Sequence, residues 1–362
     1  MARIDLKIDV TEAAALGEPA HIAMTVILPD PADMPDRPIV CFAKPGGGYS
    51  KGYYTVDLPG PAKGAQADWH VARGWIFVAV DHLGVGESSL HGDGKRLNPS
   101  TLAAAAHDAE RQLLERLAAG TLNTGFPRID NPLKLGIGQS MGGMMTIVQQ
   151  GRHHCYDGVA ILGYSAVHTH PQHEPGTTPF TTPWFTRDTQ LDEPLAIMNP
   201  QALAEAKLLA KDAGRKFVWG FHYDDVDRQI AEGDLINFEM AQRPEEERGG
   251  FEASPWSSLT LPTVVSASSL SPGVVATEAA AIRCPVLFAM GERDVSADPK
   301  GEPRAYLSAT SVDLFICPRM GHMHNFASTR ELFWKRIETW AEWVAIVAAD
   351  TTHSTQAAGA GS

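Results

Sequence analysis

The sequence predicts an α/β domain whose mostly parallel, twisted β-sheet is flanked by helices. Six short, continuous apolar runs between residues 39 and 317 have the length and composition of strands that are buried on both faces. Helix-forming segments separate several of these runs, and such alternation is typical of a parallel sheet covered on both sides. About 120 residues separate two of the runs, far more than one crossover helix needs, which indicates an insertion.

The strands can be placed along the chain by their apolar patterns. The first two segments, Ile4–Val10 and His21–Leu28, alternate apolar and polar residues, which predicts an antiparallel pair with one solvated face. The six continuous runs predict the remaining strands. These runs are Ile39–Ala43, Trp75–Val80, Leu133–Ile137, Gly158–Leu162, Val286–Met290 and Val312–Cys317.

Three segments have the composition of helices that cover such a sheet. Leu102–Ala119 is rich in Ala, Leu, Glu and Arg, Met141–Gln150 follows a glycine turn, and Thr329–Ala348 is strongly amphipathic. Two further helix-like patches, Pro200–Lys211 and Asp225–Met240, fall inside the long insertion.

These elements predict the domain organisation. We expect an α/β core of residues 1–165 and 280–350, interrupted between strands 6 and 7 by a lid, or cap, of residues 166–279. Residues 351–362 are small and polar, which predicts a disordered tail.

The composition excludes several classes of partner. The 362-residue chain has a formal net charge of -13 and no compensating cluster of Lys and Arg, so it would repel phosphate backbones and anionic membrane surfaces. No stretch reaches the roughly 18 apolar residues that a membrane span needs, and Met1–Val10 lacks the pattern of a secretory signal. We expect a cytoplasmic protein that binds neither nucleic acid nor membranes. A homodimer is compatible with the sequence.

The four cysteines are far apart in the chain, and three of them lie in or beside strand-like runs. This distribution favours buried free thiols over a disulfide framework or a zinc site. The four are Cys41, Cys155, Cys284 and Cys317.

The strongest local signal is the segment Gly138–Gly143, which contains a G-x-S-x-G motif between a predicted strand and a predicted helix. A sharp strand-to-helix turn would hold Ser140 in a strained conformation, and glycines on either side give the chain room to pack there. The helix N-terminus behind the serine favours developing negative charge. The pattern predicts a nucleophilic serine.

A serine hydroxyl is a weak nucleophile, so the motif requires a base and an orienting acid further along the chain. Asp294 follows the strand that ends near Met290, and His322 follows the strand that ends at Cys317. Ser140, Asp294 and His322 thus come just after three separate strands, where open α/β sheets place their sites.

With these motifs the chain resembles the α/β-hydrolase family over about residues 20–165 and 280–348. The Asp81–Ser88 segment is similar to the turn that follows the fourth strand in that family. The resemblance implies Ser140 as nucleophile, His322 as general base and Asp294 as the acid that orients it.

The glycine run Gly46–Gly48 follows the third strand, where the family places half of its oxyanion hole. The histidine that usually precedes these glycines is Pro45 here. The resemblance implies that the backbone N–H groups of Gly47 and Met141 bind the oxyanion, with Gly48 as the alternative to Gly47.

Neighbouring residues offer alternatives for two of these roles. His324 lies two residues after His322, but the glycine directly before His322 matches the family pattern for the base. Glu292 and Asp298 flank Asp294, but the Gly-x-x-Asp spacing after the strand resembles the family acid.

Two polar clusters in the insertion have simpler interpretations than a metal site. Three histidines lie on an irregular, proline-containing loop, and their spacing matches no zinc pattern. Three aspartates lie at the beginning of a helix-like patch, which predicts a solvated helix start, with substrate contact as the alternative. We expect no metal and no cofactor. The clusters are His168, His170 and His173, and Asp224, Asp225 and Asp227.

The resemblance implies hydrolysis through an acyl-enzyme on Ser140. The aromatic residues of the insertion suit a medium-sized, partly apolar carboxylic ester or lactone. Candidate substrate-binding residues are Tyr49, Trp184 and His222. The alternatives are a hydrolase of carbon–carbon bonds in a diketone, an acyltransferase, and a catalytically inactive protein that binds a small molecule.

Overall fold

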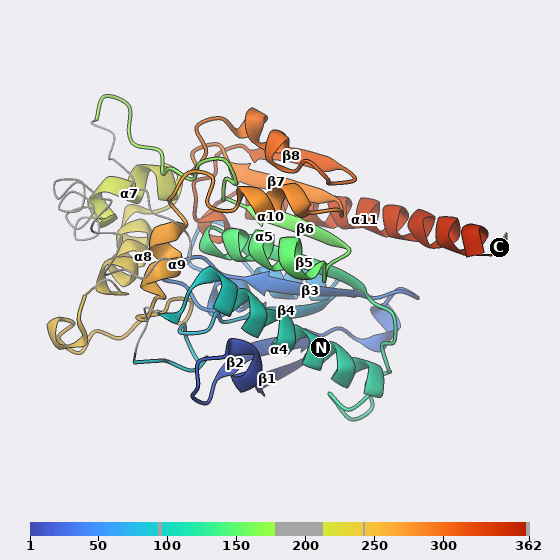
Figure 1. Ribbon diagram of the computed structural model, residues 1–362. Helices are drawn as coiled ribbons and strands as arrows, with labels where there is room; N and C mark the ends of the chain where they lie inside the picture. Colours follow the sequence, from blue (N-terminus) through green and yellow to red (C-terminus); the bar gives the residue numbers. More distant parts are fainter. Residues whose placement is uncertain (93–95, 178–212, 242, 360–362) are drawn as a thin grey trace.

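The computed structural model describes residues 1–92, 96–177, 213–241 and 243–359 (Figure 1). Its centre is an eight-stranded sheet with the order β1-β2-β4-β3-β5-β6-β7-β8. The strands are β1 (Ala2–Asp9), β2 (His21–Leu28), β3 (Ile39–Lys44), β4 (Ile76–Val80), β5 (Leu133–Gln139), β6 (Gly158–Leu162), β7 (Val286–Gly291) and β8 (Val312–Cys317).

The sheet is mostly parallel. β2 pairs antiparallel with both β1 and β4, and the remaining neighbours pair parallel. Each of the six continuous apolar runs forms one strand from β3 to β8, so the predicted fold class is confirmed. The predicted solvated face is found on β1, whose residues alternate in burial, but not on β2, which is buried on both faces. The reason is that α3 and α4 both pack on β2.

Short and long helices connect the strands. The 3₁₀ turns comprise Pro31–Asp33, Glu245–Glu247, Pro299–Ala305 and His324–Phe326. The α-helices are α1 (Thr11–Ala14), α2 (Gly52–Thr55), α3 (Gln66–Val71), α4 (Pro99–Ala119), α5 (Met141–His153), α7 (Ala213–Phe221), α8 (Arg228–Ala241), α9 (Thr263–Ser268), α10 (Ala276–Ala281) and α11 (Arg330–Gly359).

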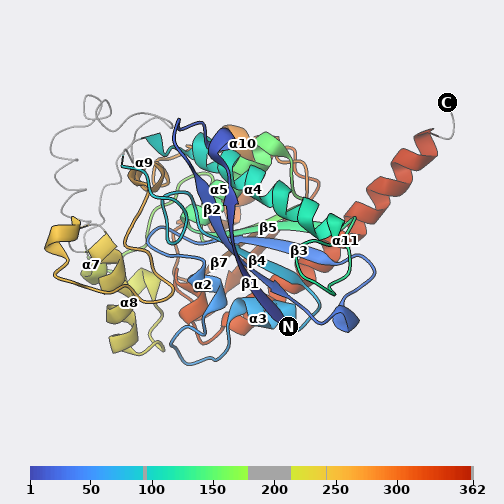
Figure 2. The same ribbon diagram turned by 90° about the horizontal axis from the view of Figure 1, so that it is seen from below.

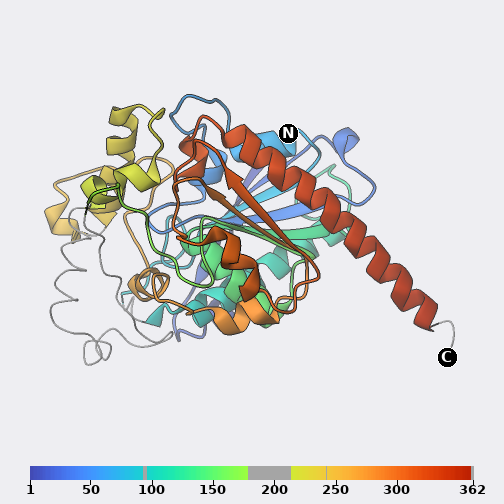
Figure 3. The same cartoon turned by 90° about the horizontal axis from the view of Figure 1, so that it is seen from above.

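The helices form a layer on each face of the sheet. Val40 and Phe42 of β3 pack in the apolar core beneath α4, α5 and α10, while Cys41 and Ala43 pack in the core beneath α3 and α11. Figure 2 shows β1 and β2 at one edge of the sheet, and Figure 3 shows α11 crossing the second face. The period-2 alternation of strand side chains therefore fills two cores at once.

The last helix is longer than the sequence pattern indicates. α11 continues to Gly359, so residues 351–359 of the tail that we expected to be disordered are helical. These residues contain no proline that would break a helix. The end of α11 extends away from the sheet (Figure 3).

The chain between β6 and β7 carries α7, α8, α9 and α10. Figure 1 shows α7, α8 and α9 together on one side of the core, whereas α10 packs on α5 in the helix layer. The predicted patch Asp225–Met240 corresponds to α8, and the patch Pro200–Lys211 lies outside the described residues. We use the word cap for α7, α8, α9 and the described loops that join them. None of the helices described here is both long enough and apolar enough to cross a membrane.

Candidate active site

Ser140 occupies a sharp turn between β5 and α5, with φ 54° and ψ −122°. Residues with a side chain rarely adopt this backbone conformation. A Cβ on Gly138 would lie 2.1 Å from the carbonyl oxygen of Gly142, and a Cβ on Gly142 would lie 2.1 Å from that of Lys44. The two glycines of the motif are therefore required for the close packing that holds Ser140 in this conformation at the N-terminus of α5.

Three side chains that follow β5, β7 and β8 form one hydrogen-bonded line. His322 Nε2 lies 2.9 Å from Ser140 Oγ, and His322 Nδ1 lies 2.6 Å from Asp294 Oδ1. The tautomer with its proton on Nδ1 satisfies both contacts, because Nδ1–H then donates to the carboxylate and the Ser140 hydroxyl donates to Nε2. This arrangement can move the serine proton to an oriented base.

Asp294 is 1% exposed and accepts four hydrogen bonds. Oδ1 accepts from His322 and from the Val295 N–H at 2.8 Å, and Oδ2 accepts from the Gly291 N–H at 2.9 Å and from His324 Nε2 at 2.8 Å. Burial alone would raise the pKa of Asp294, but the two histidines outweigh it and hold this pKa below its ordinary value. Asp294 is therefore a buried carboxylate that stays charged.

His324, considered above as an alternative base, bonds Asp294 through its Nε2. Among the described contacts, the histidine that bonds Ser140 Oγ is His322. The ring of His324 packs on Phe333 with 4.5 Å between ring centroids. Sequence reasoning treated His322 and His324 as rivals, whereas the structure gives each histidine one oxygen of the same carboxylate. In the sequence, the pattern that could have indicated this sharing is the His-x-His spacing of the two residues.

The alternative acids have other partners. Glu292 accepts from the Tyr223 hydroxyl at 2.9 Å and from the Arg319 N–H at 2.9 Å. Asp298 caps the 3₁₀ turn Pro299–Ala305 and pairs with Arg304. Neither carboxylate contacts His322 in the part of the chain that the structure describes.

The expected oxyanion-hole residues lie beside Ser140. Gly47 and Met141 line the same cavity as Ser140. Gly48 does not line it in the described structure; its φ is 82°, and a Cβ there would lie 2.9 Å from the ring of Phe238. The positions of Gly47 and Met141 favour this pair over Gly48.

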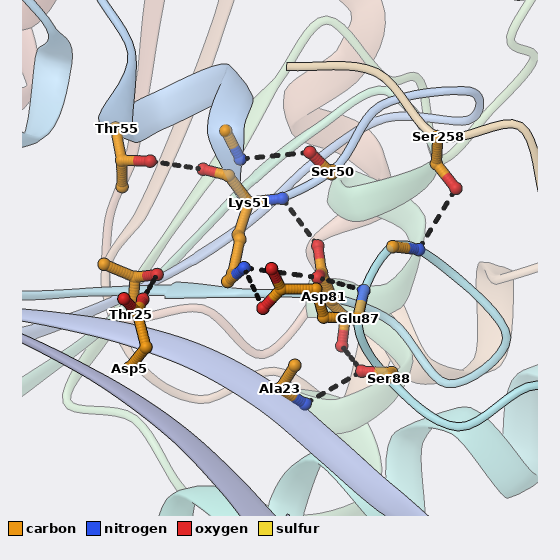
Figure 4. Close-up of polar contacts among 12 residues, drawn as sticks. Asp5, Ala23, Thr25, Ser50, Lys51, Thr55, Asp81, Glu87, Ser88 and Ser258 are labelled. Atoms are coloured by element: carbon orange, nitrogen blue, oxygen red, sulfur yellow. Dashed lines mark hydrogen bonds and ion pairs between the residues drawn. The ribbon is translucent and has the colours of Figure 1, made fainter. Parts of the chain in front are cut away.

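A buried network supports the glycine loop from behind. His82 Nε2 donates to the carbonyl oxygen of Pro45 at 2.9 Å, and burial lowers the pKa of His82 to about 4. Asp81 accepts from the N–H groups of Lys51 at 2.6 Å and Glu87 at 2.9 Å, which ties the turn after β4 to the loop after β3 (Figure 4). These contacts fix the loop that carries Gly47.

Gln139, the residue before the serine, is a site residue that sequence reasoning missed. Its Nε2 donates to the carbonyl oxygen of His322 at 3.0 Å. Its Oε1 is buried against Gly46 and has no hydrogen-bond partner among the described residues. Gln139 therefore joins the turn that carries Ser140 to the loops that carry the base and the glycines.

The cavity in front of Ser140 has a volume of about 90 Å³ within the described residues. The cap supplies most of its apolar wall, with Phe217 and Phe221 from α7 and Phe238 from α8. The remaining lining residues are Gly46, Gly47, Tyr49, Gln139, Met141, Ser266, Ser269, Leu270, His322 and Met323. Such a wall favours a small apolar group next to the serine.

The three expected substrate-binding residues have different positions. Tyr49 lines the cavity, and its hydroxyl donates to buried Asp234 at 2.6 Å. Among the described residues, His222 is not part of the lining of this cavity; its Nε2 lies 3.0 Å from Asp234, and it lines a separate hollow of the cap. Trp256 Nε1 also donates to Asp234, at 3.2 Å. Trp184 lies outside the described residues.

The cap is hydrogen-bonded directly to the loop that carries the base. The N–H groups of His322 and Met323 donate to the carbonyl oxygens of Gly220 and Phe221, both at 2.9 Å. The rings of Phe221 and His322 lie 4.8 Å apart. The end of α7 therefore helps to set the orientation of His322.

The residue before Asp294 makes a second joint between core and cap. Arg293 is 7% exposed and pairs with Asp224 at 3.0 Å. Its guanidinium also lies over the rings of Trp219 and Tyr223, at 4.6 and 4.1 Å from their centroids. Asp224 thus has a structural partner, and Asp227 accepts from the Gln229 N–H at the start of α8.

The histidine cluster of the insertion forms ring contacts and loop contacts. His168 and His170 have ring centroids 5.5 Å apart, and His173 Nδ1 lies 3.1 Å from Thr177 Oγ1. The described portion of the chain contains no group of three His, Cys, Asp or Glu side chains that could hold a metal ion.

No family model and no curated protein matches the sequence. Solved structures do resemble it. A bromoperoxidase from Bacillus anthracis is 17% identical with a TM-score of 0.56, and the match covers 94% of this chain and all of that one. A proline iminopeptidase from Mycobacterium smegmatis is 15% identical with a TM-score of 0.57, covering 95% and 100%. The carboxylesterase CesB from Bacillus subtilis is 12% identical with a TM-score of 0.54, covering 94% and 91%.

These likenesses extend over nearly the whole chain at low identity, so they concern the fold. An alpha-beta-hydrolase from Saccharomyces cerevisiae peroxisomes is also similar, with 12% identity, a TM-score of 0.57 and coverage of 96% and 89%. The strand order, the two helix layers and the serine turn after β5 agree with the family that the motifs resemble. The chain has the α/β-hydrolase fold.

Proposed function

We propose that this protein is a serine hydrolase that cleaves a carboxylic ester or lactone with a small, apolar acyl part. The observation that carries the proposal is the line from Ser140 Oγ through His322 to buried Asp294, which opens on an aromatic cavity. The carboxylesterase among the similar structures supports the same class of reaction.

The reaction begins with acylation of the serine. Ser140 Oγ attacks the substrate carbonyl carbon while His322 Nε2 takes the hydroxyl proton. The N–H groups of Gly47 and Met141 bind the oxyanion, and Asp294 stabilises the positive imidazole. When the tetrahedral intermediate collapses, the carbon–oxygen bond to the leaving alcohol breaks and His322 returns the proton to that alcohol.

Hydrolysis of the acyl-enzyme repeats these steps with water. His322 Nε2 takes a proton from the water as its oxygen attacks the ester carbon, and Ser140 leaves with that proton. A lactone follows the same path, except that its alcohol and acid remain in one molecule.

The cavity supports a preference for short acyl groups. Its volume of about 90 Å³ is far below the roughly 300 Å³ at which drug-sized pockets begin. The rings of Phe217, Phe221 and Phe238 would exclude water and contact an apolar chain. A short aliphatic acyl group satisfies both the size and the chemistry of this wall.

Labelling with a fluorophosphonate probe tests the proposal, together with turnover of p-nitrophenyl esters of increasing chain length. We expect the labelled peptide to contain Ser140, and turnover to fall as the acyl chain lengthens. Ser140→Ala should lose both signals. A protein with neither labelling nor turnover would contradict the proposal and favour an inactive binding protein.

Product analysis separates the reaction classes. Ester hydrolysis yields one acid and one alcohol, and its rate needs only water as acceptor. A rate that requires a second acceptor would favour an acyltransferase, and cleavage of a diketone without ester turnover would favour a carbon–carbon hydrolase. Either result would replace the proposed function.

A further inference from the structure

His324 makes a contact that a Ser, His, Asp set does not need. Its Nε2 donates to Asp294 Oδ2 at 2.8 Å, while His322 Nδ1 donates to Oδ1 at 2.6 Å. The two imidazoles therefore hold opposite oxygens of one carboxylate, which is 1% exposed. Together with the Gly291 and Val295 N–H groups they complete four hydrogen bonds, the capacity of an ionised carboxylate.

The surroundings of His324 favour its neutral form. The side chain is 2% exposed and packs on Phe333, and no described residue bonds its buried Nδ1. A proton on Nδ1 would bury an N–H without an acceptor. Burial lowers the pKa of His324, although the Asp294 charge acts in the opposite direction. His324 thus contributes a neutral Nε2–H donor to Asp294.

The other titratable groups near this pair do not replace that donor. Tyr53 of α2 accepts from the Asn325 N–H at 3.1 Å, and burial raises the pKa of its phenol. Arg293 directs its guanidinium to Asp224 and to two aromatic rings of the cap. His322 Nδ1 bonds Asp294, and His322 Nε2 lies 2.9 Å from Ser140 Oγ and 3.4 Å from Gln139 Nε2.

We propose that His324 is a positioning residue that fixes the Asp294 carboxylate toward His322 and stabilises the negative charge on Oδ2. This inference rests on the proposed function for its kinetic consequence. A carboxylate that loses one donor becomes a stronger acceptor at its remaining contacts. Without His324, Asp294 would stabilise the positively charged form of the His322 ring more strongly, so less neutral ring would be available to take the Ser140 proton.

A pair of amide variants separates the hydrogen bond from simple side-chain volume. In His324→Gln the amide nitrogen can take the place of Nε2, whereas the shorter His324→Asn places its amide near Nδ1 and loses contact with Asp294. We expect the Asn variant to lower kcat about tenfold with little change in KM. The acidic limb of its pH profile of kcat/KM should move up by about one pH unit, and the Gln variant should recover both properties.

Phe333→Leu is the matched control for packing. This change loosens the ring contact of His324 without removing a hydrogen-bond partner. It should reduce thermal stability but leave the acidic limb in place. Equal pH profiles for the Asn variant and the wild type, or equal loss in the Asn and Gln variants, would overturn the proposal.

A measurement on the wild-type protein needs neither substrate nor a His324 variant. Ring ¹⁵N NMR with labelled histidine follows both imidazoles through a pH titration, and His322→Asn assigns the His322 signals by their loss. We expect His324 to keep a neutral ring protonated at Nε2 throughout the pH range in which the protein stays folded. A His324 ring that gains a second proton within this range would overturn the inference. Expected NMR behaviour without ester turnover would instead reject the proposed function alone.

Discussion

His322 Nε2 lies 2.9 Å from Ser140 Oγ although the two residues are 182 positions apart in the chain. Ser140 follows β5 and His322 follows β8, and β6 and β7 lie between these strands in the sheet, so the loops after β5 and β8 must reach toward each other at the same edge of the sheet. The contact also depends on the cap, whose Gly220 carbonyl oxygen accepts from the His322 N–H. The proposed base is therefore positioned by core and cap together.

Ser140→Ala and His322→Ala should each reduce kcat by about 10⁴-fold or more, and the double variant should lose little beyond either single one. The physical reason is that a serine without its base, or a base without its serine, gives no activated nucleophile. Steady-state kinetics on p-nitrophenyl acetate measures the three values. Multiplicative losses would mean that the two side chains act independently.

The same variants separate catalysis from stability. Ser140 contributes little to the apolar cores, and its strained φ of 54° is retained by alanine. Ser140→Ala should therefore unfold within a few degrees of the wild type. A markedly lower unfolding temperature would argue against a purely catalytic role for this serine. Ser308→Ala, at an exposed turn position, provides the control.

Phe238→Ala should extend the range of acyl groups that the protein accepts. The ring of Phe238 fills the space beside Gly48 and forms part of the cavity wall. Removing it should raise the ratio of kcat/KM for octanoyl over acetyl esters about tenfold or more, because each accommodated methylene contributes to binding. Ile236→Ala changes an exposed residue of the same helix and should leave the ratio unchanged. An unchanged ratio in Phe238→Ala would show that acyl chains bind elsewhere.

The Asp234 network should contribute strongly to the attachment of the cap. Asp234 is 1% exposed and accepts from Tyr49, His222 and Trp256. Tyr49→Phe removes one donor and should lower the free energy of unfolding by about 1.5 kcal/mol. Asp234→Ala leaves the buried donors of Tyr49 and His222 and the partly buried donor of Trp256 without an acceptor, and should cost about 3 kcal/mol or more.

Urea unfolding monitored by tryptophan fluorescence measures both changes. Glu252→Ala removes an exposed loop carboxylate and should change the free energy of unfolding by less than about 0.5 kcal/mol. Equal costs for Tyr49→Phe and Asp234→Ala would contradict a shared network, because the second change removes three hydrogen bonds.

The parts of the structure that the sequence predicts are those with local patterns. Continuous apolar runs indicated β3 to β8 because buried parallel strands need apolar side chains on both faces. The serine turn was also readable, since Gly138 and Gly142 are required by contacts within a few residues of Ser140 and by the end of β3. The apolar pattern did not predict that β2 is buried on both faces, because this burial depends on the packing of α3 and α4.

The parts that the sequence could not predict depend on docking between distant segments. Tyr49 and Asp234 are 185 positions apart, and no spacing rule relates them. The hydrogen bond between His222 and Asp234, which are 12 positions apart, likewise follows from no pattern in the sequence. His322 and His324 can share Asp294 only because both rings are oriented toward its carboxylate. The sequence of the short loop after β8 does not by itself determine these orientations.

Acid should destabilise the protein partly through His70, far from Ser140 in sequence. His70 is fully buried, stacks on Trp75 and Phe77, and has no hydrogen-bond partner on either ring nitrogen among the described residues. Burial lowers the pKa of His70 to about 3, with Arg73 adding to the effect. Below about pH 6.5, His70 therefore binds a proton in the unfolded chain but stays neutral in the folded chain.

The sign of this linkage follows from the depressed pKa of the folded state. The neutral ring contributes full stability above the unfolded pKa of about 6.5, and that contribution falls by about 1.4 kcal/mol per pH unit as the pH drops toward 3. His70→Phe keeps an aromatic ring in the same stack but cannot take up a proton. Its unfolding temperature should therefore decrease less than that of the wild type between about pH 7 and pH 4. His154→Asn, at an exposed left-handed position, is the control, and its unfolding temperature should change with pH as in the wild type. If the unfolding temperature of His70→Phe decreased with pH as steeply as that of the wild type, other groups would govern acid unfolding.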